Sequence, residues 1–236
     1  MNKDSREEIL RKIKRGLYGD PEHKDSGVSS RDAERDFGNE AEGLEKSRIT
    51  NIDSLLDSFI KELLNVNAVV LKAENDEVVI ALITEIVQEK GISSYTMWES
   101  DYINSVGLKE LLNREGLEQI TSRDKNEIAG AGMGITGADY AIADTGTLVL
   151  LTDENRPRSV SLLPPIHLAI VNKADIVSDI RELFIILKQM LDTGWNVPSC
   201  MTFITGPSRT ADIELNLTLG VHGPKELYVI IKTDSH

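Results

Sequence analysis

Apolar residues recur at helical spacing in several parts of the chain, and short apolar runs separate these parts. The helical spacing predicts helices over Ile52–Leu64, Glu77–Glu89, Leu108–Asn113 and Asp175–Leu191, with Gly91 closing the second. The runs that predict β-strands are Ala68–Leu71, Ser93–Trp98, Gly116–Ile120, Tyr140–Ala143, Thr147–Leu151, Ile166–Asn172, Met201–Thr205 and Leu227–Lys232. Helices that alternate with strands predict an α/β domain built on a largely parallel sheet.

The first 48 residues have a different composition and pattern of apolar residues. Ser5–Leu17 has a helical pattern that starts with a capping box, and Gly19–Lys46 is almost all charged, Gly, Ser or Asn. The second stretch cannot bury enough apolar surface to offset its ordering entropy, so we expect a flexible arm. We therefore divide the chain into a helix and arm (1–48) and an α/β domain (49–236). The helix and arm are either an inert tail or a segment that docks on a partner or a sister subunit.

Composition limits the classes of partner. The 236 residues are 40% hydrophobic and carry a formal net charge of -13. An acidic protein repels nucleic acid and anionic membranes at long range, although a few placed donors can still bind a small anion. The sequence contains neither a secretory signal nor a membrane-spanning stretch, which predicts a soluble, cytoplasmic protein.

The chain has one cysteine, Cys200. A lone thiol forms no internal disulfide and cannot hold an iron–sulfur cluster, which generally needs about four protein ligands. We expect Cys200 to fill space beside a strand. His167 and His222 lie far from any second ligand at metal-site spacing, so no metal site is predicted. His222 is the better candidate for a pocket donor or general base, whereas His167 is expected to be a satisfied histidine at a strand end.

The segment Gly132–Gly137 matches the dinucleotide fingerprint G-x-G-x-x-G. That fingerprint works only between a strand and a following helix, where the pyrophosphate meets the helix N-terminus. Here a helical segment, Ser122–Ala129, precedes the glycines, and a strand-like run follows them. We therefore reject a nicotinamide or flavin site and expect the glycines to allow close backbone passage and to leave room for a ligand.

Two carboxylates, Asp139 and Asp144, flank the apolar run before Thr145-Gly146-Thr147. Strand alternation directs them to opposite faces unless a bulge intervenes. They either cap strand ends in turns, or Asp144 and the threonine hydroxyls line a pocket.

The loop Gly206–Glu214 is the most conspicuous candidate site. Strand Met201–Thr205 leads into it, and Ala211–Leu217 is expected to begin a helix, whose N-terminus would attract an anion. Ser208 and Thr210 add hydroxyl donors, and Arg209 adds a planar fork suited to a carboxylate or phosphate. In the structural alternative, Ser208 or Thr210 only caps the helix, and Arg209 pairs with Asp212 or Glu214.

The segments Gly137–Thr147, Gly206–Glu214 and Gly220–Pro224 together resemble the LUD-domain family, of the lactate-utilisation protein C (YkgG) type. The resemblance covers roughly Ile49 to Thr233. It implies a three-layer α/β/α Rossmann-like domain, similar to sugar-phosphate isomerases and CoA transferases (NagB/RpiA-like). The motif positions are expected to form one pocket, with His222 and Asp144 as catalytic candidates and with these residues binding substrate: Thr136, Gly137, Thr145, Gly146, Thr147, Gly206, Ser208, Arg209, Thr210 and Glu214.

The resemblance also implies a part in oxidising L-lactate to pyruvate, in a system whose partner subunits carry iron–sulfur clusters. With one cysteine, this chain is expected to carry no cofactor and to bind a small carboxylate or organise its partners. Whether it is itself catalytic stays open, as does homo-oligomer formation. The alternatives are a self-sufficient isomerase or acyl-transfer enzyme acting on a small anion, and a binding module that recruits a partner through residues 1–46.

Overall fold

The computed structural model describes residues 51–195, 198–211, 217–219 and 223–234. The predicted helix Ser5–Leu17 and the arm Gly19–Lys46 lie outside these ranges. The described chain opens with a helix over residues 51–65, as the spacing of its apolar residues predicted. None of the helices in the described part of the chain has the length and apolar composition of a membrane span.

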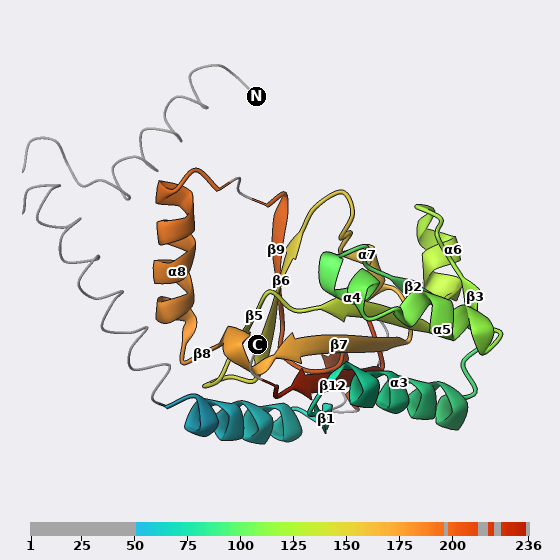
Figure 1. Ribbon diagram of the computed structural model, residues 1–236, viewed down its shortest axis with the longest axis horizontal. Coiled ribbons are helices and arrows are strands. Elements are labelled where there is room, and N and C mark those ends of the chain that lie inside the picture. Colours follow the sequence, from blue (N-terminus) through green and yellow to red (C-terminus); the bar gives the residue numbers. More distant parts are fainter. Residues whose placement is uncertain (1–50, 196–197, 212–216, 220–222, 235–236) are drawn as a thin grey trace, which may run out of the picture. The chain divides into compact units, whose positions relative to one another are not determined.

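Six parallel strands form the larger of the two main sheets (Figure 1). Their order in space is β1 (Val69–Ala73), β12 (Glu226–Lys232), β7 (Ile166–Asn172), β4 (Met133–Gly137), β2 (Ser94–Met97) and β3 (Glu118–Gln119). The central strands are apolar along almost their whole length, because a parallel sheet is buried on both faces. This confirms the prediction of an α/β fold with a parallel sheet.

Helices cover both faces of this sheet. They are α3 (Asp76–Lys90), α4 (Asp101–Ser105), α5 (Leu108–Arg114), α6 (Lys125–Gly130) and α7 (Ser159–Leu162). Successive side chains of a strand point to opposite faces. Lys232 of β12 meets Asp76 of α3 on one face, with Nζ and Oδ1 2.7 Å apart. Leu227, of opposite parity in β12, lines a cavity on the other face together with Ser161 of α7.

A four-stranded mixed sheet, which the sequence did not predict as a separate layer, accompanies the parallel one. Its order is β8 (Ile176–Val177), β5 (Tyr140–Ile142), β6 (Thr147–Thr152) and β9 (Cys200–Ile204). Leu148 and Leu150 join the main core, whereas Val149 and Leu151 pack with helix α8 (Ile180–Asp192). The second sheet therefore stands between α8 and the main core (Figure 1).

Helix α8 begins later than the apolar spacing indicated. Ile176 and Val177 form the short strand β8, which follows a 3-10 turn, η1 (Lys173–Asp175). Asp179 then caps the helix, because its carboxylate accepts hydrogen bonds from the backbone N–H groups of Arg181 and Glu182. The prediction of a helix from Asp175 is thus wrong for its first five residues and correct for the rest.

Helix α7 lies directly on strand β4 at Gly134. A Cβ atom at this position would lie 1.9 Å from the carbonyl oxygen of Val160. In the nominal dinucleotide motif, Gly132 directly precedes β4, and Gly134 and Gly137 lie within it, after helix α6. The predicted order, with a helix before the glycines and a strand after them, is confirmed, and it is the reverse of the order that the fingerprint requires. The expected close backbone passage is also confirmed at Gly134, where the helix backbone, rather than a ligand, fills the space.

Candidate functional site

The two motifs that the sequence singled out meet through a chain of threonine hydroxyls. Thr147 Oγ1 lies 2.8 Å from Thr145 Oγ1 and 2.7 Å from Thr205 Oγ1. The contact arises because Thr147 begins β6 and Thr205 directly follows β9, and these two strands are antiparallel neighbours. That the residues of the two motifs form one ligand pocket stays a prediction.

Both motifs also contact the C-terminal end of helix 51–65. Gly146 has φ 62°, and a Cβ atom there would lie 2.7 Å from the backbone nitrogen of Leu63. Gly206 has φ 88°, and its Cβ would lie 2.9 Å from Cβ of Val66. Glycine is required at both positions for conformation and for space. Both glycines make room for the helix end, and their role in binding a ligand stays a prediction.

The helix predicted over Ala211–Leu217 is wrong. Its ends lie in two antiparallel strands, β10 (Arg209–Ala211) and β11 (Leu217–Leu219), in which Ala211 is the partner of Leu217. The helix N-terminus proposed to attract an anion is therefore lost. Arg209 is exposed, and its guanidinium donates a hydrogen bond to the carbonyl oxygen of Val66.

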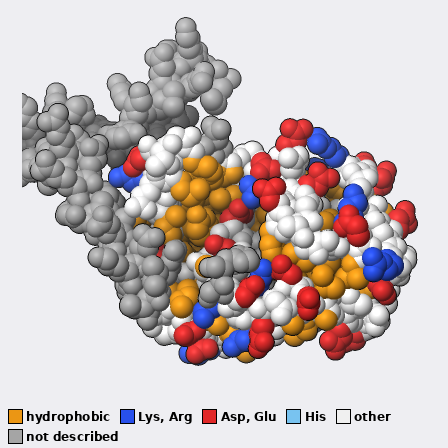
Figure 2. All heavy atoms as spheres, in the orientation of Figure 1, with side chains coloured by type: hydrophobic (Ala, Val, Ile, Leu, Met, Phe, Trp, Pro, Cys, Tyr) orange, Lys and Arg blue, Asp and Glu red, His pale blue; other side chains and the backbone are white. Residues whose placement is uncertain are grey.

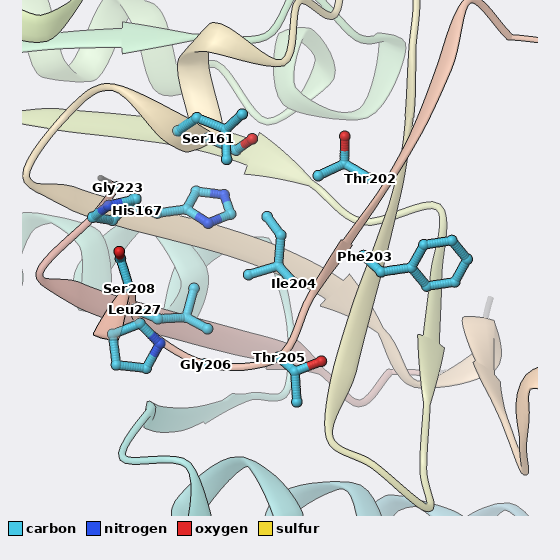
Figure 3. A pocket seen from close by; sticks show the side chains of 13 residues that line it. Ser161, His167, Thr202, Phe203, Ile204, Thr205, Gly206, Ser208, Gly223 and Leu227 are labelled. Atoms are coloured by element: carbon cyan, nitrogen blue, oxygen red, sulfur yellow. The ribbon is translucent and has the colours of Figure 1, made fainter. Parts of the chain in front are cut away.

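Beside the Gly206 loop lies a cavity of about 190 Å³ (Figure 3). We call it the His167 cavity. Helix α7, strands β7, β9 and β12 and two loops contribute to it, and the residues used below are Ser161, His167, Thr202, Ile204, Gly206, Ser208, Gly223 and Leu227. Ser208 donates its backbone N–H to the carbonyl oxygen of Pro224, at 2.9 Å, which ties the Gly206 loop to the segment before β12.

His167 projects from β7 toward this cavity (Figure 3). Its side chain is buried, and Nε2 shares a hydrogen bond of 2.8 Å with Thr136 Oγ1 of β4. The other ring nitrogen, Nδ1, is buried and has no hydrogen-bond partner in the described part of the chain. The expectation of a satisfied histidine is thus correct for one nitrogen and wrong for the other.

Burial also fixes the charge of this ring. Desolvation lowers the pKa of His167 from 6.5 to about 3, so the imidazole is neutral at pH 7. A neutral imidazole has one donor and one acceptor nitrogen. The Thr136 hydroxyl can donate to Nε2 or accept from it, so Nδ1 carries either an N–H or a lone pair.

The lining of the His167 cavity is apolar and hydroxyl-rich. Leu227 and Ile204 provide apolar surface, whereas Thr202 and Ser208 provide hydroxyl groups. The described side chains that line it include no charged group. Such a cavity suits a small molecule with hydroxyl or carbonyl oxygens, and a charged ligand needs a cation from outside the lining. Arg209, directly after Ser208, and Lys225, directly after Pro224, are the nearest cations along the chain.

The other predicted site residues are distributed differently. Asp144 is exposed in the β5–β6 turn, and its backbone N–H donates to the carbonyl oxygen of Ser178 at 3.1 Å. Thr136 is buried beneath His167, and Gly137 ends β4. Thr210 lies in β10, and His222 and Glu214 lie outside the described residues. Whether Asp144 and His222 act as a catalytic pair stays a prediction.

Asp139 has a structural role that the sequence left open. Its Oδ1 accepts a hydrogen bond from Arg156 at 2.7 Å, and its Oδ2 accepts one from the backbone N–H of Leu151 at 2.7 Å. Neither Arg156 nor Ser161 in the cavity could be predicted from the sequence, because neither belongs to a motif. Both become visible only when segments distant in sequence come together.

Comparison with known proteins adds a family. A family model described as the LUD domain matches residues 56–231. A protein named lactate utilization protein C from Halalkalibacterium halodurans is 36% identical over 155 residues, which are 64% of this chain and 67% of the relative. The protein of that name from Bacillus subtilis is 40% identical over 136 residues, covering 53% of this chain and 57% of the relative. Lactate utilization protein C 1 of Bacillus mycoides is 34% identical over 169 residues, covering 68% and 72%.

One solved structure has a similar fold. The crystal structure of a DUF162 family protein from Deinococcus radiodurans superposes with a TM-score of 0.56 at 22% sequence identity. The match covers 76% of this chain and 97% of that one. At this identity the likeness concerns the fold alone.

Proposed function

The chain belongs to the LUD-domain family, and we propose that it is a non-redox subunit of a system that oxidises L-lactate to pyruvate. The names of its relatives support a role in lactate utilization, since the relatives matched over about two thirds of their length are called lactate utilization protein C. The assignment of a subunit role rests on the chemistry of this chain, which the following paragraphs develop.

The fold supports a finer assignment. Helices cover both faces of the parallel sheet, an arrangement in keeping with a three-layer α/β/α domain. We propose that this part of the chain is of the sugar-phosphate isomerase and CoA-transferase-like kind. The second, mixed sheet with α8 is then an addition to that domain.

The residues of this chain do not fit an iron–sulfur cluster. A cluster generally needs about four protein ligands, mostly cysteine thiolates, and these 236 residues contain only Cys200. Its Sγ lies 3.9 Å from the hydroxyl of Thr202 in β9. Within the described ranges, no three His, Cys, Asp or Glu side chains gather to hold a metal ion. We therefore propose that the clusters are carried by partner subunits.

We propose that the ligand of this subunit is a small carboxylate with an oxygen on its α-carbon, bound in the His167 cavity. The observation that carries this proposal is the buried Nδ1 of His167, which lacks a partner among the described residues. A buried nitrogen without a partner costs about 1–3 kcal/mol, and a ligand oxygen at this point would recover that energy. Either tautomer of His167 can serve, so the ring can accept from the hydroxyl of lactate or donate to the carbonyl of pyruvate.

The carboxylate of such a ligand needs a positive partner. Arg209 follows Ser208 of the cavity lining, and one of its five N–H donors goes to Val66. We propose that the remaining donors bind the carboxylate, with Ser208 and the backbone of the Gly206 loop. Thr210, Glu214 and His222 follow in the same motifs and are proposed to complete the site.

Three ligands that differ at one carbon test the proposal. Calorimetric titration of the isolated chain should show that L-lactate and pyruvate bind at least about tenfold more tightly than propionate, which lacks the α-oxygen (about 1.4 kcal/mol). In His167→Leu this preference should disappear, and in Arg209→Ala all three ligands should bind more weakly.

Equal binding of propionate and lactate would contradict the role of His167. The isolated, cofactor-free chain should also fail to reduce a dye with lactate as donor. Dye reduction, or turnover of a sugar phosphate or CoA thioester, would instead favour a self-sufficient enzyme.

A further inference from the structure

A second cavity lies at the carboxyl ends of the parallel strands. Its volume is about 340 Å³, within the range of roughly 300–1,000 Å³ that holds drug-sized ligands. We call it the tryptophan cavity and define it by Trp98, Tyr102, Asp139, Arg156, Asn172 and Trp195. Apolar side chains gather over the second sheet between α8 and α4 on this side of the molecule (Figure 2).

The topology of the sheet marks this place. Within the parallel sheet, the strand that follows β2 along the chain is β3, which lies on one side of β2. The strand of this sheet that follows β4 is β7, which lies on the opposite side. Trp98 and Tyr102 follow β2, and Gly137 ends β4, so the cavity opens where the two connections diverge. In open α/β sheets, ligands bind outside the carboxyl ends of the strands at such a divergence.

Among the described residues of the lining, the one cation, Arg156, is already paired. The Arg156 guanidinium lies 2.7 Å from Asp139 and 2.8 Å from Asp153, and it covers the Trp98 ring with its carbon 5.6 Å from the ring centroid. Asp139 is held in turn by the backbone N–H of Leu151. Two carboxylates already balance the charge of Arg156, so an anionic ligand would meet a net negative charge there, which disfavours its binding.

The neighbouring cation is paired as well. Lys232, at the end of β12, is 2% exposed, with Nζ 2.7 Å from Asp76 and 3.4 Å from Asp234. It lies 5.1 Å from the centroid of the Tyr102 ring. The lining also carries Asp175, so the acidic groups around the tryptophan cavity outnumber the basic ones.

We propose that the tryptophan cavity binds a planar ring without a negative charge, a ligand different in class from the small carboxylate of the His167 cavity. Aromatic side chains from the segment after β2, from β5 and from the segment after α8 line it, namely Trp98, Tyr102, Tyr140 and Trp195. Aromatic rings and the flat guanidinium of Arg156 favour stacked or edge-on contact with another ring. Asn172, at the end of β7, donates one amide N–H to Asp175 at 3.0 Å, and the rest of its amide can hydrogen-bond a ring substituent.

The tryptophans themselves provide the reporter. The sequence contains two tryptophans, and both line this cavity. Protein labelled with 5-fluorotryptophan therefore gives two ¹⁹F signals that both report on it. We would titrate the full chain with three pairs that share a ring and differ in charge: nicotinamide with nicotinate, benzamide with benzoate, and adenosine with adenosine monophosphate.

At least one uncharged ring should shift both signals in a saturable way, and its anionic counterpart should bind at least tenfold more weakly. L-lactate, which is proposed to occupy the His167 cavity, should leave both signals in place. No saturable shift with any of the three uncharged rings, or equal binding of the charged rings, would overturn the proposal. Because lactate is measured separately, failure of one site leaves the other standing.

Two substitutions test the cause of the selectivity. Asp139→Asn, which keeps the shape of the side chain, removes one carboxylate from Arg156 and should raise the affinity for the anionic ring at least fivefold relative to the uncharged one. Trp195→Leu removes one wall and should weaken the uncharged ring at least tenfold, as read from the remaining Trp98 signal. Unchanged selectivity in the first variant together with unchanged affinity in the second would refute the assignment.

Discussion

Thr136 and His167 share a buried hydrogen bond of 2.8 Å between Oγ1 and Nε2, across the neighbouring strands β4 and β7. Thr136 lies one strand away from the His167 cavity and does not line it, yet it holds the ring that does. Removing the hydroxyl in Thr136→Val would leave both ring nitrogens without a protein partner. We expect the free energy of unfolding to fall by about 1–3 kcal/mol, measured by urea denaturation.

A double-mutant cycle provides the control for this prediction. His167→Leu alone should also destabilise the fold, because it leaves the Thr136 hydroxyl buried and unpaired. Combining the two substitutions should cost clearly less than the sum of the single losses, since the two groups then disappear together. Simple additivity would show that the hydrogen bond contributes nothing to stability.

The lowered pKa of His167 predicts a dependence of stability on pH. The ring has a pKa of about 3 in the fold and about 6.5 in the unfolded chain, so below pH 6.5 the unfolded state binds the extra proton. Stability contributed by the neutral ring is complete above pH 6.5 and is lost as the pH falls toward 3. We expect the free energy of unfolding to drop by about 2 kcal/mol between pH 7 and pH 5 from this group.

His167→Gln cannot titrate and isolates this contribution. Denaturation curves of the variant should show a correspondingly smaller drop over the same pH interval. Parallel pH profiles for the two proteins would mean that His167 has the same pKa in the fold as in the unfolded chain.

Gly134 predicts a severe steric effect. In Gly134→Ala the new Cβ would lie 1.9 Å from the carbonyl oxygen of Val160, so α7 must move away from β4. Overpacking of this kind costs about 1–3 kcal/mol or more. Gly130→Ala is the matched control, because a Cβ there meets nothing within 4 Å and alanine favours the helix. Comparable melting temperatures for the two variants would contradict the close contact between α7 and β4.

Gly206 predicts a combined conformational and steric effect. It has φ 88°, and a Cβ there would lie 2.9 Å from Cβ of Val66. Gly116 has nearly the same dihedral angle, φ 84°, with nothing within 4 Å of its Cβ position. Gly116→Ala therefore measures the conformational cost, about 1–2 kcal/mol. Gly206→Ala should cost about 1–3 kcal/mol more by urea denaturation, and equal losses would show that the loop does not press on the helix end.

The core strands could be predicted because their signal is local. Ile166–Asn172 and Leu227–Lys232 are apolar runs, and a strand buried on both faces needs little else. The end of α3 could also be predicted from a local signal, because the helix ends at Gly91, which adopts the left-handed conformation with φ 61°. The position of α7 on β4 could not be predicted, because a glycine at position 134 indicates a close contact without identifying the segment that makes it.

The wrong helix after Arg209 had a signal against it. From Ala211 to Leu219 apolar and polar residues alternate, which is typical of a half-buried strand. The helix was predicted instead because the segment after strand Met201–Thr205 resembles a strand–loop–helix junction. The His167 cavity had no such signal, because Ser161, His167 and Ser208 come from three separate segments and meet only through the order of the strands.

The pairing of β1 with β12 has a consequence for synthesis. Val69 of β1 is the partner of Tyr228 of β12, and β12 also pairs with β7. A ribosome releases β1 first and β12 long after it, at roughly 5–20 residues per second. Throughout that interval β1 has no partner, and β7 has an open edge. Nascent chains should therefore depend on protection from edge-to-edge aggregation until the last strand enters the sheet.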